Sequence, residues 1–150
     1  VCPAEWAMDH RPLLRFDGGA DDYCYPDEAT NANNNQCKPF NPEAPIYYDI
    51  ASCGNYMKLA WHFWYGHQKG CDHFGVDHGH GDDWEHMTIN FARTSPEYDW
   101  VQDSVTWYQH SGWYTWQNTD TNPGVYVGKI AHGSYDNWCD EKFPSVFKQF

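Results

Sequence analysis

Hydrophobic and polar positions alternate along the middle of the chain. In residues 56–65, YMKLAWHFWY, every odd-numbered position is apolar, while the even-numbered positions include Lys58 and His62. Residues 84–92, WEHMTINFA, alternate in the same way. A period of two, carried by aromatic and aliphatic side chains, is typical of a β-strand with one buried face. Both segments are therefore predicted to be strands, and the Gly-, His- and Asp-rich residues 66–83 between them are predicted to form a loop.

Later segments extend this pattern. Residues 104–110 and 113–118, SVTWYQH and WYTWQN, flank the dipeptide Ser-Gly and are predicted to form a β-hairpin around it. Residues 124–132, GVYVGKIAH, are predicted to form a further strand. The tail, residues 139–150, is expected to form a short helix or to pack as coil.

The beginning of the chain shows no such periodicity. Residues 1–45 are dense in Gly, Pro, Asn and Asp, which are turn formers, and are predicted to be irregular. No internal repeat and no linker divides the chain. Residues 1–150 are therefore predicted to form one all-β domain, a single antiparallel β-sandwich with long loops.

The cysteines add a prediction about stabilisation and compartment. The six are Cys2, Cys24, Cys37, Cys53, Cys71 and Cys139. An even number without a C-x-x-C pair favours three disulfides over a zinc or redox site. Sequence alone does not fix the pairing, and our working prediction is Cys24–Cys37, Cys53–Cys71 and Cys2–Cys139, so that residues 1–45 are stapled. We expect a mature secreted protein, or an excised domain of one, without a transmembrane segment.

Charge narrows the choice of partner. The chain carries 21 acidic and 9 basic residues, a formal net charge of −12. Such a chain repels nucleic acid and anionic membranes at long range, so nucleic acid is not an expected partner. No P-loop, dinucleotide fingerprint or nucleophile elbow is present. A monomer that meets a cell-surface or cell-wall glycan is expected.

Aromatic residues make up 19% of the chain, with nine Trp and eleven Tyr. One explanation is a β-sheet core, because aromatic side chains suit pleated surfaces. The other is a surface that stacks on sugar rings, for which Trp61, Trp64 and Trp113 are the candidates because they lie near predicted loop ends. Both explanations stay open at this point.

The decapeptide DHGHGDDWEH, residues 77–86, concentrates three His, three Asp and one Glu. If the strand begins near residue 83, Asp83 and Glu85 lie side by side on the face of Met87, about 7 Å apart in Cα spacing. Carboxylates this close repel one another, which raises one pKa unless a divalent cation lies between them. His80 can reach the same cation, and such ligands suit Ca, Mg or Mn and allow Zn. A metal site, metal-free acid/base chemistry and a solvated acidic loop are the alternatives.

Residues 79–85, GHGDDWE, resemble the signature heptapeptide of the necrosis-inducing secreted proteins of microbes, Gly-His-Arg-His-Asp-Trp-Glu. The matching positions are Gly79, His80, Asp83, Trp84 and Glu85. The resemblance implies a β-sandwich that holds one divalent cation, here through Asp72, His80, Asp83 and Glu85, with a later His matched by His132. It also implies cytolysis, in which the cation binds the sugar headgroup of a membrane sphingolipid.

Three segments also resemble fungal proteins named for vacuolar protein sorting. The family's Asp-Trp-Glu-His, Gln-His-(Ser/Gly)-Gly and Val-Tyr-Val-x-Lys-x-x-His-x-Ser-Tyr patterns match residues 83–91, 108–113 and 125–136. Together the two resemblances cover residues 56–136.

Two classes of function fit these features. The first is a glycosidase-like hydrolase of an extracellular glycan or cell-wall polysaccharide, and we take it as the leading hypothesis because Asp82 adds a carboxylate where the heptapeptide has His. Its acid/base residues would be Asp82, Asp83, Glu85 and His132, and its sugar contacts His110, Trp113 and Trp64. The alternative is a cytolysin or lectin that binds a sugar headgroup through the cation without turnover. His132 and His110 also have structural explanations, a hydrogen bond to the backbone and a turn cap.

Overall fold

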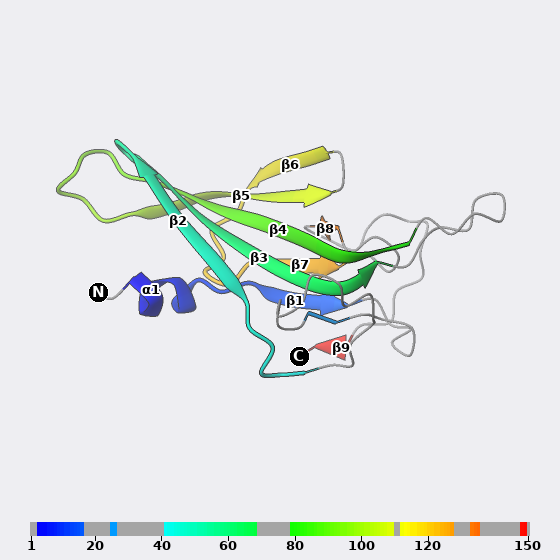
Figure 1. Ribbon diagram of the computed structural model, residues 1–150. Coiled ribbons are helices and arrows are strands. Elements are labelled where there is room, and N and C mark those ends of the chain that lie inside the picture. The colour runs from blue at the N-terminus through cyan, green and yellow to red at the C-terminus, as the bar shows by residue number, and fades with distance from the viewer. Residues whose placement is uncertain are drawn as a thin grey trace.

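The computed structural model describes residues 3–16, 25–26, 41–68, 79–109, 112–127, 133–135 and 148–149. In these residues it contains one helix and nine strands, arranged in two sheets (Figure 1). The elements are α1 (Pro3–Asp9), β1 (Leu13–Phe16), β2 (Tyr47–Cys53), β3 (Tyr56–Gln68), β4 (His80–Ala92), β5 (Val101–Gln109), β6 (Gly112–Gln117), β7 (Gly124–Val127), β8 (Ser134–Tyr135) and β9 (Lys148–Gln149).

The larger sheet contains the strands that the alternating pattern predicts. Its order is β2-β3-β4-β5-β6, and every neighbouring pair is antiparallel. β3 and β4 are longer than predicted, because their pairing continues through Tyr65↔Asp83 to Gln68↔His80. The predicted loop over residues 66–83 is therefore wrong at both ends, where the chain remains in the ladder.

The register of β5 and β6 also moves the hairpin turn. Gln109 pairs with Gly112, so residues 110–111, His-Ser, connect the strands in place of the predicted Ser-Gly. These two residues lie outside the part of the chain that the structure describes. The hairpin itself is confirmed by the pairing from Ser104 to Gln109.

The smaller sheet has the order β8-β7-β1-β9 and corrects three predictions. β1 pairs with β7 in parallel, so the sandwich is not purely antiparallel. Helix α1 and strand β1 fall in residues 1–45, which were predicted to be irregular. The tail, predicted to be helix or coil, supplies β9, which pairs with β1. Each of these elements is at most seven residues long, too short for a periodic pattern to show.

The two sheets share one hydrophobic core, which confirms the all-β sandwich class. Figure 1 shows β1 and β7 beneath the long strands β3 and β4. Trp107 in the larger sheet donates its indole N–H to the carbonyl oxygen of Gly124 in the smaller sheet, at 3.2 Å. Helix α1 covers one end, where the ring of Trp6 lies 4.9 Å from that of Phe91. Trp61 and Trp107 are buried, so packing explains these two aromatic residues.

The position of Cys53 contradicts the predicted Cys53–Cys71 disulfide. Cys53 lies opposite Tyr56 in the ladder of β2 and β3, next to the turn that joins these strands. Its thiol is free and exposed. β3 then extends over 13 residues, roughly 40 Å at about 3.3 Å per residue. Residues 69–71 can span only about 10 Å, so they cannot bring Cys71 back to Cys53. The expectation that all six cysteines are paired is therefore wrong; the other five lie outside the described residues.

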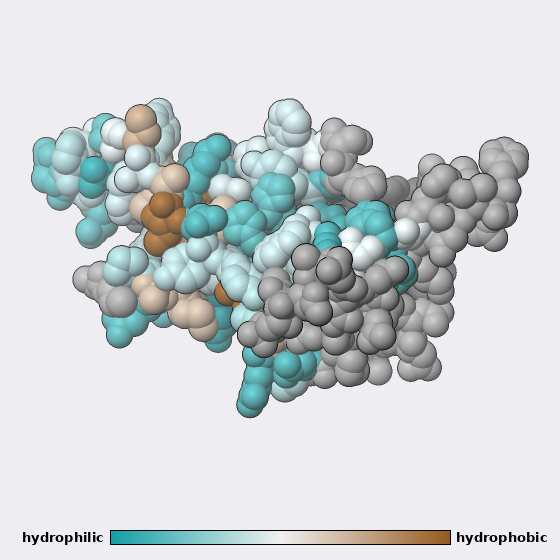
Figure 2. Space-filling view, in the orientation of Figure 1, coloured by the Kyte–Doolittle hydropathy of each residue, from teal (hydrophilic) through white to brown (hydrophobic). Residues whose placement is uncertain are grey.

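The surface agrees with the acidic, polar composition. Figure 2 shows a largely hydrophilic face, with the most hydrophobic colour concentrated in the region of β2. Ile50 of this strand is exposed. No helix in the described ranges is long and apolar enough to cross a lipid bilayer.

Candidate functional site

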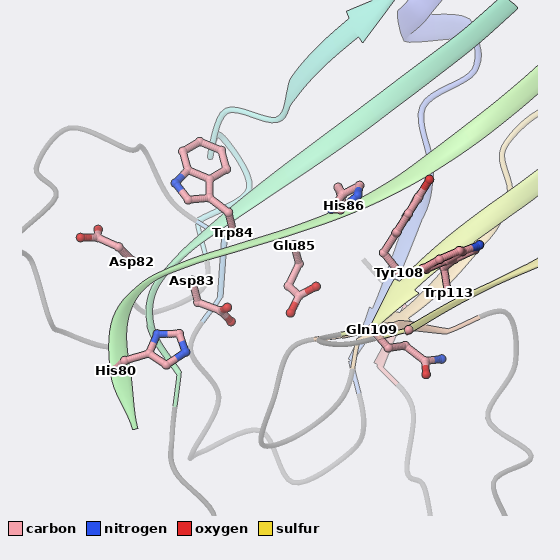
Figure 3. Close-up of a pocket in the computed structure, with 10 residues that line it drawn as sticks. His80, Asp82, Asp83, Trp84, Glu85, His86, Tyr108, Gln109 and Trp113 are labelled. Atoms are coloured by element: carbon pink, nitrogen blue, oxygen red, sulfur yellow. The ribbon is translucent and has the colours of Figure 1, made fainter. Parts of the chain in front are cut away.

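The candidate site forms where β4 loses one of its two partner strands. β4 pairs with β3 from Ala92 to His80, but its pairing with β5 begins only at Met87. His80 and residues 82–86 therefore border a pocket of about 570 Å³ on the β5 side. The end of β5 and the start of β6, including Tyr108 and Trp113, line it from the other direction (Figure 3).

Two carboxylic acids extend from β4 on the core-facing side of the strand. Asp83 and Glu85 are each only 5% exposed, and they continue the face of Met87 and Ile89. Figure 3 shows both carboxyl groups on the same side of β4. The prediction that these two residues share a face is confirmed, because the strand alternates from Asp83 onward.

Burial and crowding change the acidity of these groups. Desolvation, with the nearby Asp83 carboxylate as a second cause, raises the pKa of Glu85 to about 8. Tyr65, the cross-strand partner of Asp83, is fully buried, and its pKa is raised well above its usual value by burial and then by Glu85 and Asp83. Without a cation, Glu85 therefore retains its proton at neutral pH.

The hydrogen bond of His80 selects one of its two ring nitrogens as the donor. Its Nδ1 lies 3.0 Å from the carbonyl oxygen of Gly81, and because that oxygen can only accept, Nδ1 must donate. In a neutral imidazole with this hydrogen bond, the lone pair is on Nε2, the atom that would bind a cation. Figure 3 shows the imidazole on the side of β4 that carries Asp83.

The donor types fit a hard divalent cation, but the ligand set is incomplete in the residues described. Two carboxylates and a neutral imidazole suit Ca or Mg. No group of three His, Cys, Asp or Glu side chains in the described ranges is close enough together to hold a metal ion. The fourth predicted ligand, Asp72, lies outside these ranges, so the cation site stays a prediction.

Asp82 does not join the other carboxylates, which corrects its predicted place beside them. Its backbone is left-handed, with φ of 55°, and its side chain lies on the opposite side of β4 (Figure 3). There it accepts a hydrogen bond of 3.3 Å from the indole Nε1 of Trp64. Trp64 is only 2% exposed, so the prediction that it stacks on a sugar is wrong.

Two exposed tryptophans line the pocket: Trp113, which is 70% exposed, and Trp84, which is 48% exposed. Of the other predicted site residues, His110 and His132 lie outside the described part of the chain.

Sequence reasoning missed His86 and Tyr108, which line the pocket with their rings 4.0 Å apart and nearly parallel. Burial, with His62 as a second cause, lowers the pKa of His86, so its ring is neutral at pH 7. The alternation of β4 places His86 on one face with the other even-numbered residues, so the sequence could have indicated it. Tyr108 is found only from the register of β5.

Comparisons with known proteins identify the fold. No protein-family model matches the sequence, and no curated protein matches it. The crystal structure of necrosis and ethylene inducing protein 2, from the causal agent of cocoa's witches' broom disease, matches with a TM-score of 0.62 and 16% identity, over 88% of this chain and 67% of that one.

Two further structures match at a similar level. The non-toxic protein HaNLP3 has a TM-score of 0.64 and 13% identity, over 97% of this chain and 72% of that chain. NLPPya in complex with glucosamine has a TM-score of 0.59 and 16% identity, over 89% and 67%. This chain therefore has the fold of these necrosis and ethylene inducing proteins.

Proposed function

We propose that this protein is a secreted, toxin-like or lectin-like glycan-binding protein that holds a sugar headgroup in the pocket between β4 and the start of β6. One observation carries the proposal: the pocket sets the buried pair Asp83 and Glu85 against the exposed indole of Trp113. Such a site offers charge for the polar groups of a sugar and an aromatic face for its apolar side.

The comparisons support a sugar as the ligand. NLPPya, which shares the fold, was crystallised with glucosamine and with mannosamine. Both sugars carry an amine, and a chain with a net charge of −12 attracts a cationic ligand. We therefore take an amino sugar as the first probe.

A divalent cation belongs to this proposal. Its predicted ligands are Asp72, His80, Asp83 and Glu85, and the three of these that the structure describes would have to move closer together to hold it. When bound, a Ca or Mg ion supplies a positive centre that coordinates sugar hydroxyl groups. The protein side chains orient the sugar, Trp113 by stacking against the ring and the carboxylates by keeping the cation in place.

The hydrolase hypothesis has less support than binding without turnover. It paired Glu85 with Asp82 or Asp83; the side chain of Asp82 is on the far side of β4 and bonded to Trp64, so only Asp83 of these two lies on the side of Glu85. Membrane lysis is a separate question, because the fold also occurs in the non-toxic HaNLP3.

The test is calorimetric titration of the purified protein with glucosamine, with and without added Ca. We expect Trp113→Ala to weaken binding about 10-fold, because it removes the stacking face. Asp83→Asn should abolish the dependence on Ca. Trp116→Ala is the matched control, since Trp116 is 61% exposed on the same strand but does not line the pocket.

Three results would contradict the proposal. Glucosamine that does not bind in either condition removes the sugar site, and equal losses in Trp113→Ala and Trp116→Ala remove the role of the pocket. Reducing ends released from a panel of wall polymers, and lost in Glu85→Gln, would restore the hydrolase.

A further inference from the structure

A row of four rings crosses the outer face of the larger sheet, on the side away from the core. His62, His86, Tyr108 and Trp113 come from β3, β4, β5 and β6. His62 pairs with His86 and Tyr108 pairs with Trp113, while the rings of His86 and Tyr108 join the two pairs. Neighbouring strands are about 4.8 Å apart, so the row is roughly 14 Å long.

Three of the rings, those of His62, His86 and Tyr108, are stacked on one another. The centroids of His62 and His86 are 5.7 Å apart and those of His86 and Tyr108 are 4.0 Å apart, with interplanar angles of 24° in both pairs. Beyond His62, the carboxylate of Asp49 lies 3.2 Å from the imidazole Nε2. Such mutual packing fixes the rings before any ligand arrives, which lowers the entropic cost of binding.

The row is continuous with the pocket. His86, Tyr108 and Trp113 line the pocket, and His62 lies outside it as the next ring along. The side chain of His62 is 31% exposed and that of Asp49 is 83% exposed, so this end is open to solvent. Imidazole nitrogens and a phenol hydroxyl are hydrogen-bonding groups that suit sugar hydroxyls.

We propose that a linear oligosaccharide with free amines binds across this face, its first unit in the pocket and the later units over the row toward His62 and Asp49. This rests on the proposed function and specifies its ligand as a chain of at least three units. The acidic net charge and the exposed Asp49 favour free amines over N-acetylated or anionic sugars. The alternative explanation is that the row only stabilises the sheet through cross-strand pairs.

The experiment compares glucosamine with its linear β-linked trimer on the wild-type protein by calorimetric titration. Three equivalent units alone raise the apparent affinity only about threefold, so we expect a gain of about 10-fold or more. The N-acetylated trimer should bind more weakly than the free amine.

The variant His62→Ala separates the row from the pocket. It should lower the affinity for the trimer about 2- to 10-fold and leave that for glucosamine unchanged. Tyr56→Ala is the matched control, because Tyr56 is a 72% exposed aromatic residue on the same strand and the same face, far from the pocket. It should change neither affinity.

The outcomes distinguish the two proposals. If glucosamine binds and the affinity for the trimer is no more than about threefold higher, the proposed role of the row is wrong and the pocket remains supported. An N-acetylated trimer that binds as tightly as the free amine overturns the assignment of the ligand. If neither sugar binds, the proposed function fails as well. The wild-type comparison gives this answer even if His62→Ala does not fold.

Discussion

From Asp83 onward β4 alternates inward and outward side chains, but its two halves lie in different surroundings. From Met87 to Phe91 the strand has β3 on one side and β5 on the other, and its inward side chains are at most 2% exposed. From His80 to His86 only β3 accompanies it. The inward positions there are Asp83 and Glu85. The alternation decides which face a residue is on, and the second partner strand decides whether that face becomes core or pocket.

This difference explains how buried carboxylic acids are tolerated between His80 and His86. Two carboxylic acids inside a closed core would carry a large desolvation cost. Next to a pocket, a proton on Glu85 or a cation between the two groups offsets part of that cost. The half of β4 from His80 to His86 therefore keeps two ionisable groups at a cost in stability.

The largest expected effect is in the half of β4 from Met87 to Phe91, which lies between β3 and β5 and which we call the closed half. Ile89→Ala removes a fully buried side chain between two strands and should lower the free energy of unfolding by about 2–5 kcal/mol. Asp83→Asn, six residues earlier on the same face, removes a repulsive charge and should cost much less. Urea denaturation at pH 7 measures both. Equal losses would mean that the two halves are packed alike.

The pH dependence of stability should come from the half of β4 from His80 to His86, which lacks β5 as a partner and which we call the open half. The folded-state pKa of Glu85, about 8, is above its unfolded value of 4.5, so the folded state holds the proton more tightly. Stability of the cation-free protein should therefore fall as pH rises from about 4.5 to about 8, by on the order of 3 kcal/mol.

Glu85→Gln keeps the shape of the side chain and should remove most of that slope. Glu43→Gln, at an exposed position before β2, serves as the control and should keep it. Denaturation midpoints at pH 5, 6.5 and 8 provide the measurement. A wild-type protein that gains stability over this range would contradict the assignment.

The outcome for the fold shows what periodicity can and cannot supply. Most of β3 and β4 was predictable because residues 56–65 and 84–92 alternate clearly, whereas the ends of these strands that meet at Gln68↔His80 lie outside that pattern. β1 has four residues and its partner β7 is more than 100 positions away, so nothing local indicates their parallel pairing. The same holds for β9, a two-residue strand.

The candidate site divides in the same way. Asp83 and Glu85 were placed on one face correctly, since two positions along a strand always share a face. Asp82 was grouped with them by its neighbourhood in sequence, although the same alternation puts it on the other face. Tyr65 and Tyr108 approach the site across β3 and β5, and such contacts depend on strand register, which a single sequence does not contain.

Cation binding sharpens the comparison by acting on the open half alone. Added Ca should stabilise the wild-type protein by about 1–3 kcal/mol when present well above its dissociation constant. Thermal unfolding at pH 7 measures this as a rise in Tm that chelation reverses. Asp83→Asn should lose the response, whereas Ile89→Ala should keep it from a lower starting Tm. No response in the wild type to Ca, Mg, Mn or Zn would remove the cation from the proposal.

The smallest effect concerns Asp82, where the regular ladder of the open half is interrupted. The paired residues pass from Tyr65↔Asp83 to His67↔Gly81, and the backbone of Asp82 has φ of 55°. Asn adopts this conformation readily and can still accept the indole hydrogen bond of Trp64, so Asp82→Asn should change the free energy of unfolding by at most about 0.5 kcal/mol. Asp82→Val should cost about 1–3 kcal/mol, because a β-branched residue is strained there and the hydrogen bond is lost. Urea denaturation measures the stabilities and titration with glucosamine measures the affinity, which Asp82→Asn should leave unchanged. A large loss of stability or sugar affinity in Asp82→Asn would show that the charge matters more than the backbone, and would return Asp82 to the acid/base candidates.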